Sequence, residues 1–156
     1  MGFGPEITAF LESGCALILA AVGPDGEPYA ARGWGMTVLS PDEQIVRLLL
    51  DIEDAAVAEH FRERPAIAVT AANVRNYRSV QLKGVVTAVE PAIDADRARA
   101  DDYTERFFSD VEFTDKTPRP LLSRIAADDY VAVLATFTDV FDQTPGPVAG
   151  RPIEAE

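Results

Sequence analysis

The chain has 156 residues, of which 47% are hydrophobic and 26% charged, values typical of one globular domain with a substantial core. Its formal net charge is −12, and a field of that sign repels phosphate backbones, which argues against nucleic-acid binding. A single cysteine and a single histidine exclude an intrachain disulfide and a His-based metal site within one subunit.

Turn signals and hydrophobic periodicity divide the first half of the chain into a helix, a hairpin, a third strand and a second helix. Pro5 suits a first helical turn, and Gly14 can end that helix. Pro24-Asp25-Gly26 has the chemistry of a tight turn, because Pro fixes the first corner and Gly accepts a positive φ. The predicted elements are a helix at 5–13, strands at 15–22, 28–39 and 44–50, and a helix at 54–64.

The second half contains three more strands, two helices and a tail rich in Pro and Gly. We predict strands at 66–72, 78–90 and 130–141, helices at 91–110 and 121–127, and a proline-broken loop at 115–120. The tail carries Pro145, Gly146, Pro147 and Gly150, so we expect a single domain over 1–142 and an extended C-terminal arm over 143–156.

This element order determines the expected fold class. Helices follow only some of the six strands, so the chain does not alternate strand and helix as a parallel sheet requires. The order favours an α+β fold, a mostly antiparallel six-stranded sheet that closes or nearly closes, with peripheral helices. The longest apolar run, 16–22, is too short to cross a bilayer, and the N-terminus has no signal-peptide pattern, so we expect a cytoplasmic protein with no membrane partner.

The most informative segment is the fifth strand. Its alternation places Ser79, Gln81 and Lys83 on one face and Val80 and Leu82 on the other. Consecutive side chains on one face stand about 7 Å apart, so this row could hold an elongated, oxygen-rich anionic ligand. The alternative interpretation is an outer, solvated strand face, and both stay open.

Three further side chains are candidates for binding. Trp34 stands between two glycines, which could leave room for a planar ring to stack, or it could be a core or dimer-interface residue. Arg75 and Arg78 form a basic cluster with Lys83, although Arg75 could equally belong to a polar turn. The paired carboxylates at 101–102 and 128–129 are interpreted as solvated, and one histidine gives no Ser-His-Asp arrangement.

The element order, the hairpin at Pro24-Asp25-Gly26, the segment 65–70 and the run Tyr77-Arg78-Ser79-Val80-Gln81-Leu82-Lys83-Gly84 together resemble the pyridoxamine 5′-phosphate oxidase-like family of flavin-binding split β-barrels. The resemblance covers about 7–89 and 130–141. It implies a homodimer with FMN at the subunit interface. It also implies that Arg32 contacts the FMN phosphate and that Ser79 is a polar flavin contact.

The resemblance has two departures, which shape the functional hypothesis. Where the family carries a basic pair for the phosphate, this chain reads Asp51-Ile52-Glu53-Asp54-Ala55-Ala56, so we expect FMN binding to be weak or absent. The C-terminal Trp-Arg pair of true pyridoxamine phosphate oxidases is also missing. The sequence therefore predicts an FMN-binding split-barrel protein, a flavin-dependent oxidoreductase of unassigned substrate. The alternative is a non-catalytic binding or stress-response module of the same fold that holds a deazaflavin, haem or no cofactor.

Overall fold

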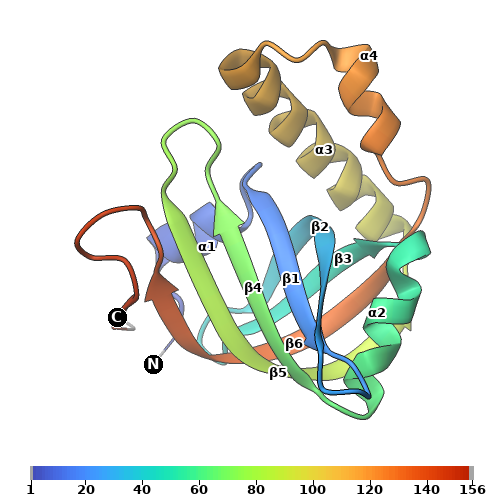
Figure 1. The fold of residues 1–156 in the computed structure, drawn as a ribbon, viewed down its shortest axis with the longest axis vertical. Coiled ribbons are helices and arrows are strands. Elements are labelled where there is room, and N and C mark those ends of the chain that lie inside the picture. Colours follow the sequence, from blue (N-terminus) through green and yellow to red (C-terminus); the bar gives the residue numbers. More distant parts are fainter. Residues whose placement is uncertain (1, 155–156) are drawn as a thin grey trace.

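Six long strands close into an antiparallel barrel in the computed structural model, which describes residues 2–154 (Figure 1). The neighbour order is β3-β2-β1-β4-β5-β6, and a further pairing between β3 and β6 closes the sheet. The strands are β1 (Ala16–Val22), β2 (Pro28–Ser40), β3 (Ile45–Asp51), β4 (Ala66–Ala72), β5 (Ser79–Pro91) and β6 (Tyr130–Asp142). The predicted fold class, an α+β split barrel with peripheral helices, is confirmed.

Three strands begin one residue later than predicted, β1 at Ala16, β3 at Ile45 and β5 at Ser79, and a left-handed residue stands shortly before two of them. Gln44 has a φ of 54° and Tyr77 a φ of 61°, which lies outside the extended region that a strand requires. β3 therefore starts at Ile45, directly after Gln44, whereas Arg78 stands between Tyr77 and the start of β5 at Ser79. The predicted tight turn at Pro24-Asp25-Gly26 joins β1 to β2, and Gly26 has the expected positive φ of 84°.

At Gly84 the backbones of β5 and β6 lie too close together to leave room for a side chain. A Cβ atom at this position would lie 2.1 Å from the carbonyl oxygen of Thr136 in β6, so no larger residue fits without a shift of the backbone. The pairing register of β5 with β6 changes between Lys83 and Gly84, as in a β-bulge. The glycine is thus explained by strand packing within this chain.

The helices differ from the prediction mainly in their ends. The predicted helix 54–64 is divided into a 3₁₀ turn, α2 and a second 3₁₀ turn. α3 continues past the predicted end and stops where Lys116 adopts a left-handed φ of 59°. The helical segments are α1 (Pro5–Leu11), η1 (Ile52–Asp54), α2 (Ala55–Glu59), η2 (His60–Arg62), α3 (Asp94–Asp115), α4 (Arg119–Leu122) and η3 (Ser123–Ile125).

α3 is anchored to the barrel by side chains from one stripe. The buried Tyr103 hydroxyl donates to the carbonyl of Cys15 over 2.7 Å. Arg99 donates to two carbonyls, those of Met36 (3.0 Å) and Glu12 (2.5 Å). These bonds satisfy backbone acceptors that the helix would otherwise cover, so the stripe holds α3 in one orientation against β2.

A second anchor is an ion pair at the start of α3. The Arg47 guanidinium from β3 forms a two-pronged contact with the Asp96 carboxylate, with both N···O distances 2.7 Å, and also reaches Glu90 at 2.6 Å. The Asp96 side chain is only 7% exposed, and its second oxygen accepts the backbone N–H of Ile93. One carboxylate therefore both binds Arg47 and caps the helix.

The predicted C-terminal arm returns to the barrel. After a loop with positive φ at Gly146 and Gly150, the short strand β7 (Arg151–Pro152) pairs with the end of β6. The ends of the described chain lie at the same end of the barrel (Figure 1). The division into 1–142 and 143–156 stays a prediction. Among residues 2–154, no helix is long and apolar enough to cross a membrane.

Candidate functional site

The outer surface of β1, β2, β4 and β5 brings several of the predicted site residues onto one face of the sheet. In the pairing register, Arg32 lies opposite Ile18, Ile18 opposite Thr70, and Thr70 opposite Gln81. Lys83 lies one pleat further along β5, opposite Ala68. We call the following residues the outer face: Ala16, Ile18, Ala20, Ala30, Arg32, Ala68, Thr70, Ala72, Gln81 and Lys83.

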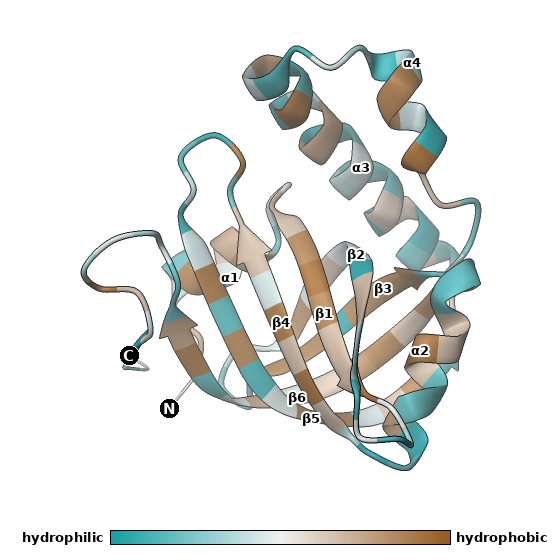
Figure 2. Cartoon of the chain, viewed as in Figure 1, coloured by the Kyte–Doolittle hydropathy of each residue, from teal (hydrophilic) through white to brown (hydrophobic). Residues whose placement is uncertain are grey.

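Small apolar residues form the centre of the outer face. Five alanines surround Ile18, whose side chain is 42% exposed. A sheet face turned to water normally carries polar residues, and along β5 polar and apolar residues do alternate, whereas β1 is mostly apolar (Figure 2). A flat bed of short side chains leaves room for a planar ring or for the surface of a second subunit.

Polar and charged groups border this bed. Arg32 stands on β2 with its guanidinium carbon 5.5 Å from the ring centre of Phe107 in α3. On the opposite side, the Gln81 amide donates to the Thr70 hydroxyl over 3.2 Å. The Lys83 ammonium lies 5.0 Å from the ring centre of Phe141 in β6. Arg32 and Gln81 are separated by three strand spacings, or about 14 Å, a span suited to an elongated ligand.

The register of the fifth strand is confirmed. Val80 and Leu82 are 2% and 0% exposed and point into the barrel, so Gln81 and Lys83 face outward. Ser79 belongs to the same outward set, but its hydroxyl already donates to the carbonyl of Tyr77 over 2.9 Å. The hydroxyl oxygen remains free to accept a hydrogen bond from a ligand.

The other three predicted site residues lie elsewhere. Trp34 is 2% exposed and packs edge-on against Phe108 of α3, which matches the core alternative. Arg75 pairs with Asp110 of α3 at 2.5 Å, and Arg78 pairs with Glu6 of α1 at 2.8 Å. The predicted basic cluster of Arg75, Arg78 and Lys83 is therefore dispersed, because α3 and α1 hold two of its members.

The turn after β3 is acidic and borders Arg32. Gly33 pairs with Leu50, so the next positions along the two strands are Arg32 and Asp51. The Asp51 carboxylate accepts the backbone N–H of Glu53, and burial, reinforced by the Asp51 charge, raises the pKa of Asp54. No group of three side chains suited to hold a metal ion occurs in residues 2–154. This turn therefore places three carboxylates just beyond the last pair of the β2–β3 register, on the side where Arg32 follows Gly33.

Sequence reasoning missed the alanine bed. Alanine has a low preference for strands, yet it recurs at Ala16 and Ala20 and again at Ala68 and Ala72. This repetition was the signal of a flat strand face that leaves room for a planar ring or a second subunit. The prediction for 15–22 is a buried strand and that for 66–72 an apolar strand, and neither includes an alanine face. The neighbourhood of Arg32 and Asp51 could not be predicted, since it depends on the β2–β3 register.

Comparison with known proteins agrees with the observed barrel. No curated protein sequence matches the chain. A structure described as a putative pyridoxamine 5′-phosphate oxidase from Lactobacillus delbrueckii has a TM-score of 0.55 at 18% identity, covering 90% of this chain and 93% of its own. General Stress Protein 26 from Bacillus anthracis has a TM-score of 0.53 at 12% identity, covering 96% and 95%. A structure named F420 Reductase has a TM-score of 0.50 at 20% identity, covering 85% and 93%.

At these identities the three structures show only that the fold is shared. The sequence gives more, because the family model described as "Pyridoxamine 5'-phosphate oxidase" matches residues 3–143. That match includes all six long strands and the whole outer face. The chain therefore belongs to the pyridoxamine 5′-phosphate oxidase family, the group that its strand order and its segment 77–84 resemble.

Proposed function

We propose that this protein is an FMN-binding oxidoreductase that holds the flavin ring on the outer face, between two copies of the chain. The observation that carries the proposal is the bed of five alanines and Ile18. Arg32 borders this bed on one side and Gln81 and Lys83 border it on the other. Ala side chains admit a planar ring close to the sheet, and the amide and the cations supply directional contacts at its edges.

The residues fit the ring of a flavin better than its phosphate. We assign the phosphate to Arg32, but Arg32 and Asp51 are the residues that follow the last β2–β3 pair, Gly33 with Leu50, and Glu53 and Asp54 come next in the same turn. Nearby carboxylates oppose the binding of an anion. We therefore expect the affinity for FMN to be micromolar rather than nanomolar, and the protein to be purified partly or wholly without flavin.

Bound flavin would supply the electron transfer, and the protein would supply position and electrostatics. Because the flavin would carry the electrons, the outer face needs no pair of acid and base side chains. Of the alternative cofactors, haem has the least support, since His60 packs against Tyr29 with ring centres 4.7 Å apart and Cys15 is buried, so neither can serve as an axial ligand on the outer face. The titration below also includes the deazaflavin F420, because one similar structure is named F420 Reductase.

Fluorescence titration of the purified protein tests the proposal. We expect FMN fluorescence to change on binding with a micromolar Kd. Riboflavin, which lacks the phosphate, should bind more weakly than FMN, but by less than the roughly ten- to hundred-fold that one unopposed charge-assisted contact would give, because the acidic turn opposes the phosphate. The variant Asp51→Asn keeps an acceptor for the Glu53 N–H and removes one negative charge, so it should tighten FMN binding and leave riboflavin unchanged.

Three outcomes of this titration would contradict parts of the proposal. If neither flavin binds and F420 does, the ligand is the deazaflavin. If none of the three binds, the outer face holds no flavin-type cofactor. A nanomolar FMN complex would place the phosphate at a site other than Arg32.

The proposal also predicts a homodimer that covers the outer face. An obligate interface buries more than about 2,000 Å² in total, and Ile18, 42% exposed among alanines, is the natural centre of such a contact. We expect light scattering to give twice the chain mass at micromolar concentration. Ile18→Glu should shift that equilibrium to monomers, because it buries an unpaired carboxylate in the interface.

Leu39→Glu is the matched control for the dimer. Leu39 is 51% exposed near the end of β2, outside the outer face, so the same change there should leave the dimer intact. A wild-type monomer would count against both the dimer and the shared site. Equal effects of the two variants would move the interface away from the outer face.

A further inference from the structure

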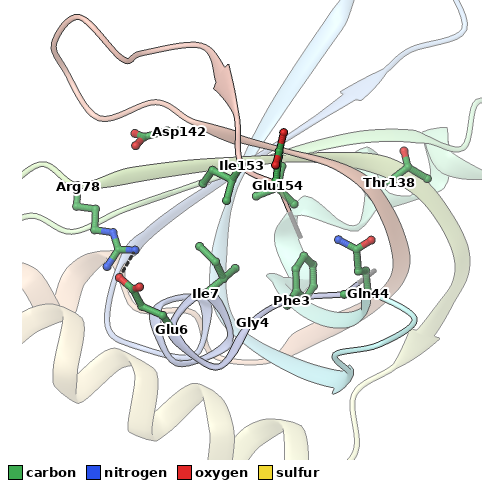
Figure 3. Close-up of a pocket in the computed structure, with 12 residues that line it drawn as sticks. Phe3, Gly4, Glu6, Ile7, Gln44, Arg78, Thr138, Asp142, Ile153 and Glu154 are labelled. Carbon is green, nitrogen blue, oxygen red and sulfur yellow. Dashed lines mark ion pairs between the residues drawn. The ribbon is translucent and has the colours of Figure 1, made fainter. Parts of the chain in front are cut away.

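A cavity of about 650 Å³ opens at the barrel end where the two ends of the described chain meet (Figure 3). Its walls come from the segment before α1, from α1 itself, from the end of β6 and from the segment after β7. None of the residues that line it belongs to the outer face, so this cavity and the proposed flavin site are separate. Its volume lies in the range of pockets that bind small organic molecules.

One part of the cavity is apolar and held in shape by main-chain bonds. The apolar lining consists of Phe3, Ile7, Val140 and Ile153. The backbone N–H of Ile153 donates to the carbonyl of Val140 over 2.8 Å, next to the pairing of β7 with β6. The returning tail is thereby fixed as one wall, and the cavity can accept an apolar body without a large rearrangement.

The charged part of the cavity is unbalanced toward negative charge. Arg78 turns to α1, where it pairs with Glu6 at 2.8 Å and lies over the ring of Phe10 at 4.9 Å. Its charge is therefore matched. Asp142 accepts the backbone N–H of Thr144 and lies opposite Arg151 in the β6–β7 register. No ion pair within 4.0 Å joins Asp142 or Glu154 to another residue of the part that the structure describes, and Arg151 is not among the residues that line the cavity. Two carboxylates thus line the cavity in addition to the Arg78–Glu6 pair.

Two neutral groups complete the polar lining. The Thr138 hydroxyl donates its hydrogen to Asp139 over 2.7 Å, which leaves its oxygen as an acceptor. Gln44, the left-handed residue just before β3, also lines the cavity, and its amide offers one oxygen that can accept and one nitrogen that can donate. An ammonium group has three N–H donors and no acceptor, so this set of acceptors matches it.

We propose that the cavity at the barrel mouth binds a small organic cation, an ammonium group joined to an apolar body. An anion would find the one guanidinium already paired and two carboxylates beside it. A wholly apolar ligand would dehydrate those carboxylates without replacing their hydrogen bonds. A cation with an apolar body satisfies both parts of the lining. This inference does not depend on the flavin proposal.

The test compares three ligands of the same shape and different charge. Phenethylamine, 2-phenylethanol and phenylacetate are titrated into the wild-type protein, with binding followed by the shifts of its backbone amide signals. We expect phenethylamine to bind about tenfold more tightly than the alcohol, the difference of one charge-assisted hydrogen bond, and phenylacetate to bind least. The amide signals that shift should belong to residues 2–4 and 153–154 and to the end of β6.

The variant Asp142→Asn locates the cation. It keeps an oxygen for the Thr144 N–H and removes the charge, so the affinity for phenethylamine should fall about tenfold while that for 2-phenylethanol stays the same. Asp128→Asn, in the turn before the opposite end of β6, is the matched control and should change nothing. Equal binding of amine and alcohol, no binding of the amine, or an amine affinity unaffected by Asp142→Asn would each overturn the proposal.

Discussion

Replacing Arg32 with alanine should weaken FMN binding about ten- to a hundred-fold, the effect of losing one charge-assisted contact of roughly 1.5–3 kcal/mol. Arg32 borders the outer face at β2 and is the cation that we propose contacts the phosphate. Its guanidinium also lies over the buried ring of Phe107, a contact worth about 0.5–2 kcal/mol, so the fold should survive. Fluorescence titration with FMN measures the loss.

Two comparisons separate the phosphate contact from other effects. Riboflavin binding should be unchanged in Arg32→Ala, because riboflavin has no phosphate. Arg124→Ala removes the same charge from an exposed position in η3 and should leave both ligands unaffected. If the variant lowers the affinities for riboflavin and FMN equally, Arg32 contacts the flavin ring or supports the dimer. If it lowers neither, the phosphate lies elsewhere.

The largest stability effect should come from Asp96→Ala. The Arg47 and Asp96 side chains are 13% and 7% exposed, and leaving a buried charge without a partner typically costs about 3–5 kcal/mol. Arg47 keeps Glu90 at 2.6 Å as a second partner, so we expect a loss below that range. The substitution also removes the acceptor for the Ile93 N–H at the start of α3. We expect a correspondingly lower free energy of unfolding by chemical denaturation, with Asp96→Asn intermediate because it retains an acceptor.

The pH dependence gives an independent check on the same contact. The hydrogen bonds from Arg47 lower the pKa of Asp96 in the folded state, with the Ile93 N–H and the Arg97 charge adding to the effect and burial opposing it. The pair therefore stabilises the fold fully above the unfolded pKa of aspartate, near 4, and the contribution disappears as the pH falls through the lower folded pKa. The difference between wild type and Asp96→Ala should shrink in acid.

Asp94→Ala is the matched control for this prediction. Asp94 lies in the same first turn of α3, but its carboxylate is fully exposed and contacts only Arg97, at 3.3 Å. Exposed ion pairs contribute little to stability, so this variant should unfold close to the wild type. A loss as large as that of Asp96→Ala would show that charge at the helix start, and not the contact with Arg47, stabilises α3.

The barrel fold could be predicted from the sequence because strong local signals mark where its strands begin and end. Pro24-Asp25-Gly26 places the first hairpin, and the alternation from Val80 to Leu82 sets the register of β5 without help from the rest of the chain. The ends of helices were less predictable. α3 continues past Asp110 through Phe113 to Asp115, since contacts with Arg75 from the β4–β5 loop extend it, and no local pattern encodes those contacts.

Only the part of the site that lies along a single strand could be predicted from the sequence. Gln81 and Lys83 share a face because alternation requires it. Arg75 and Arg78 did not join them, because partners on α3 and α1, distant in sequence, determine where a long cationic side chain points. Trp34 shows the same limit. Its neighbouring glycines indicated space, and the space is occupied by Phe108 of α3.

The meeting of the two chain ends at the barrel mouth has a consequence for how this protein is handled. Residues 2–4 and 153–154 line the cavity, so a peptide joined directly to Gly2 or Glu154 would begin beside it. A polyhistidine tag carries imidazoles that become cationic in mild acid, beside the carboxylates of Asp142 and Glu154. Ligand screens on tagged protein would therefore measure competition with the tag, and a cleaved chain is the proper material for them.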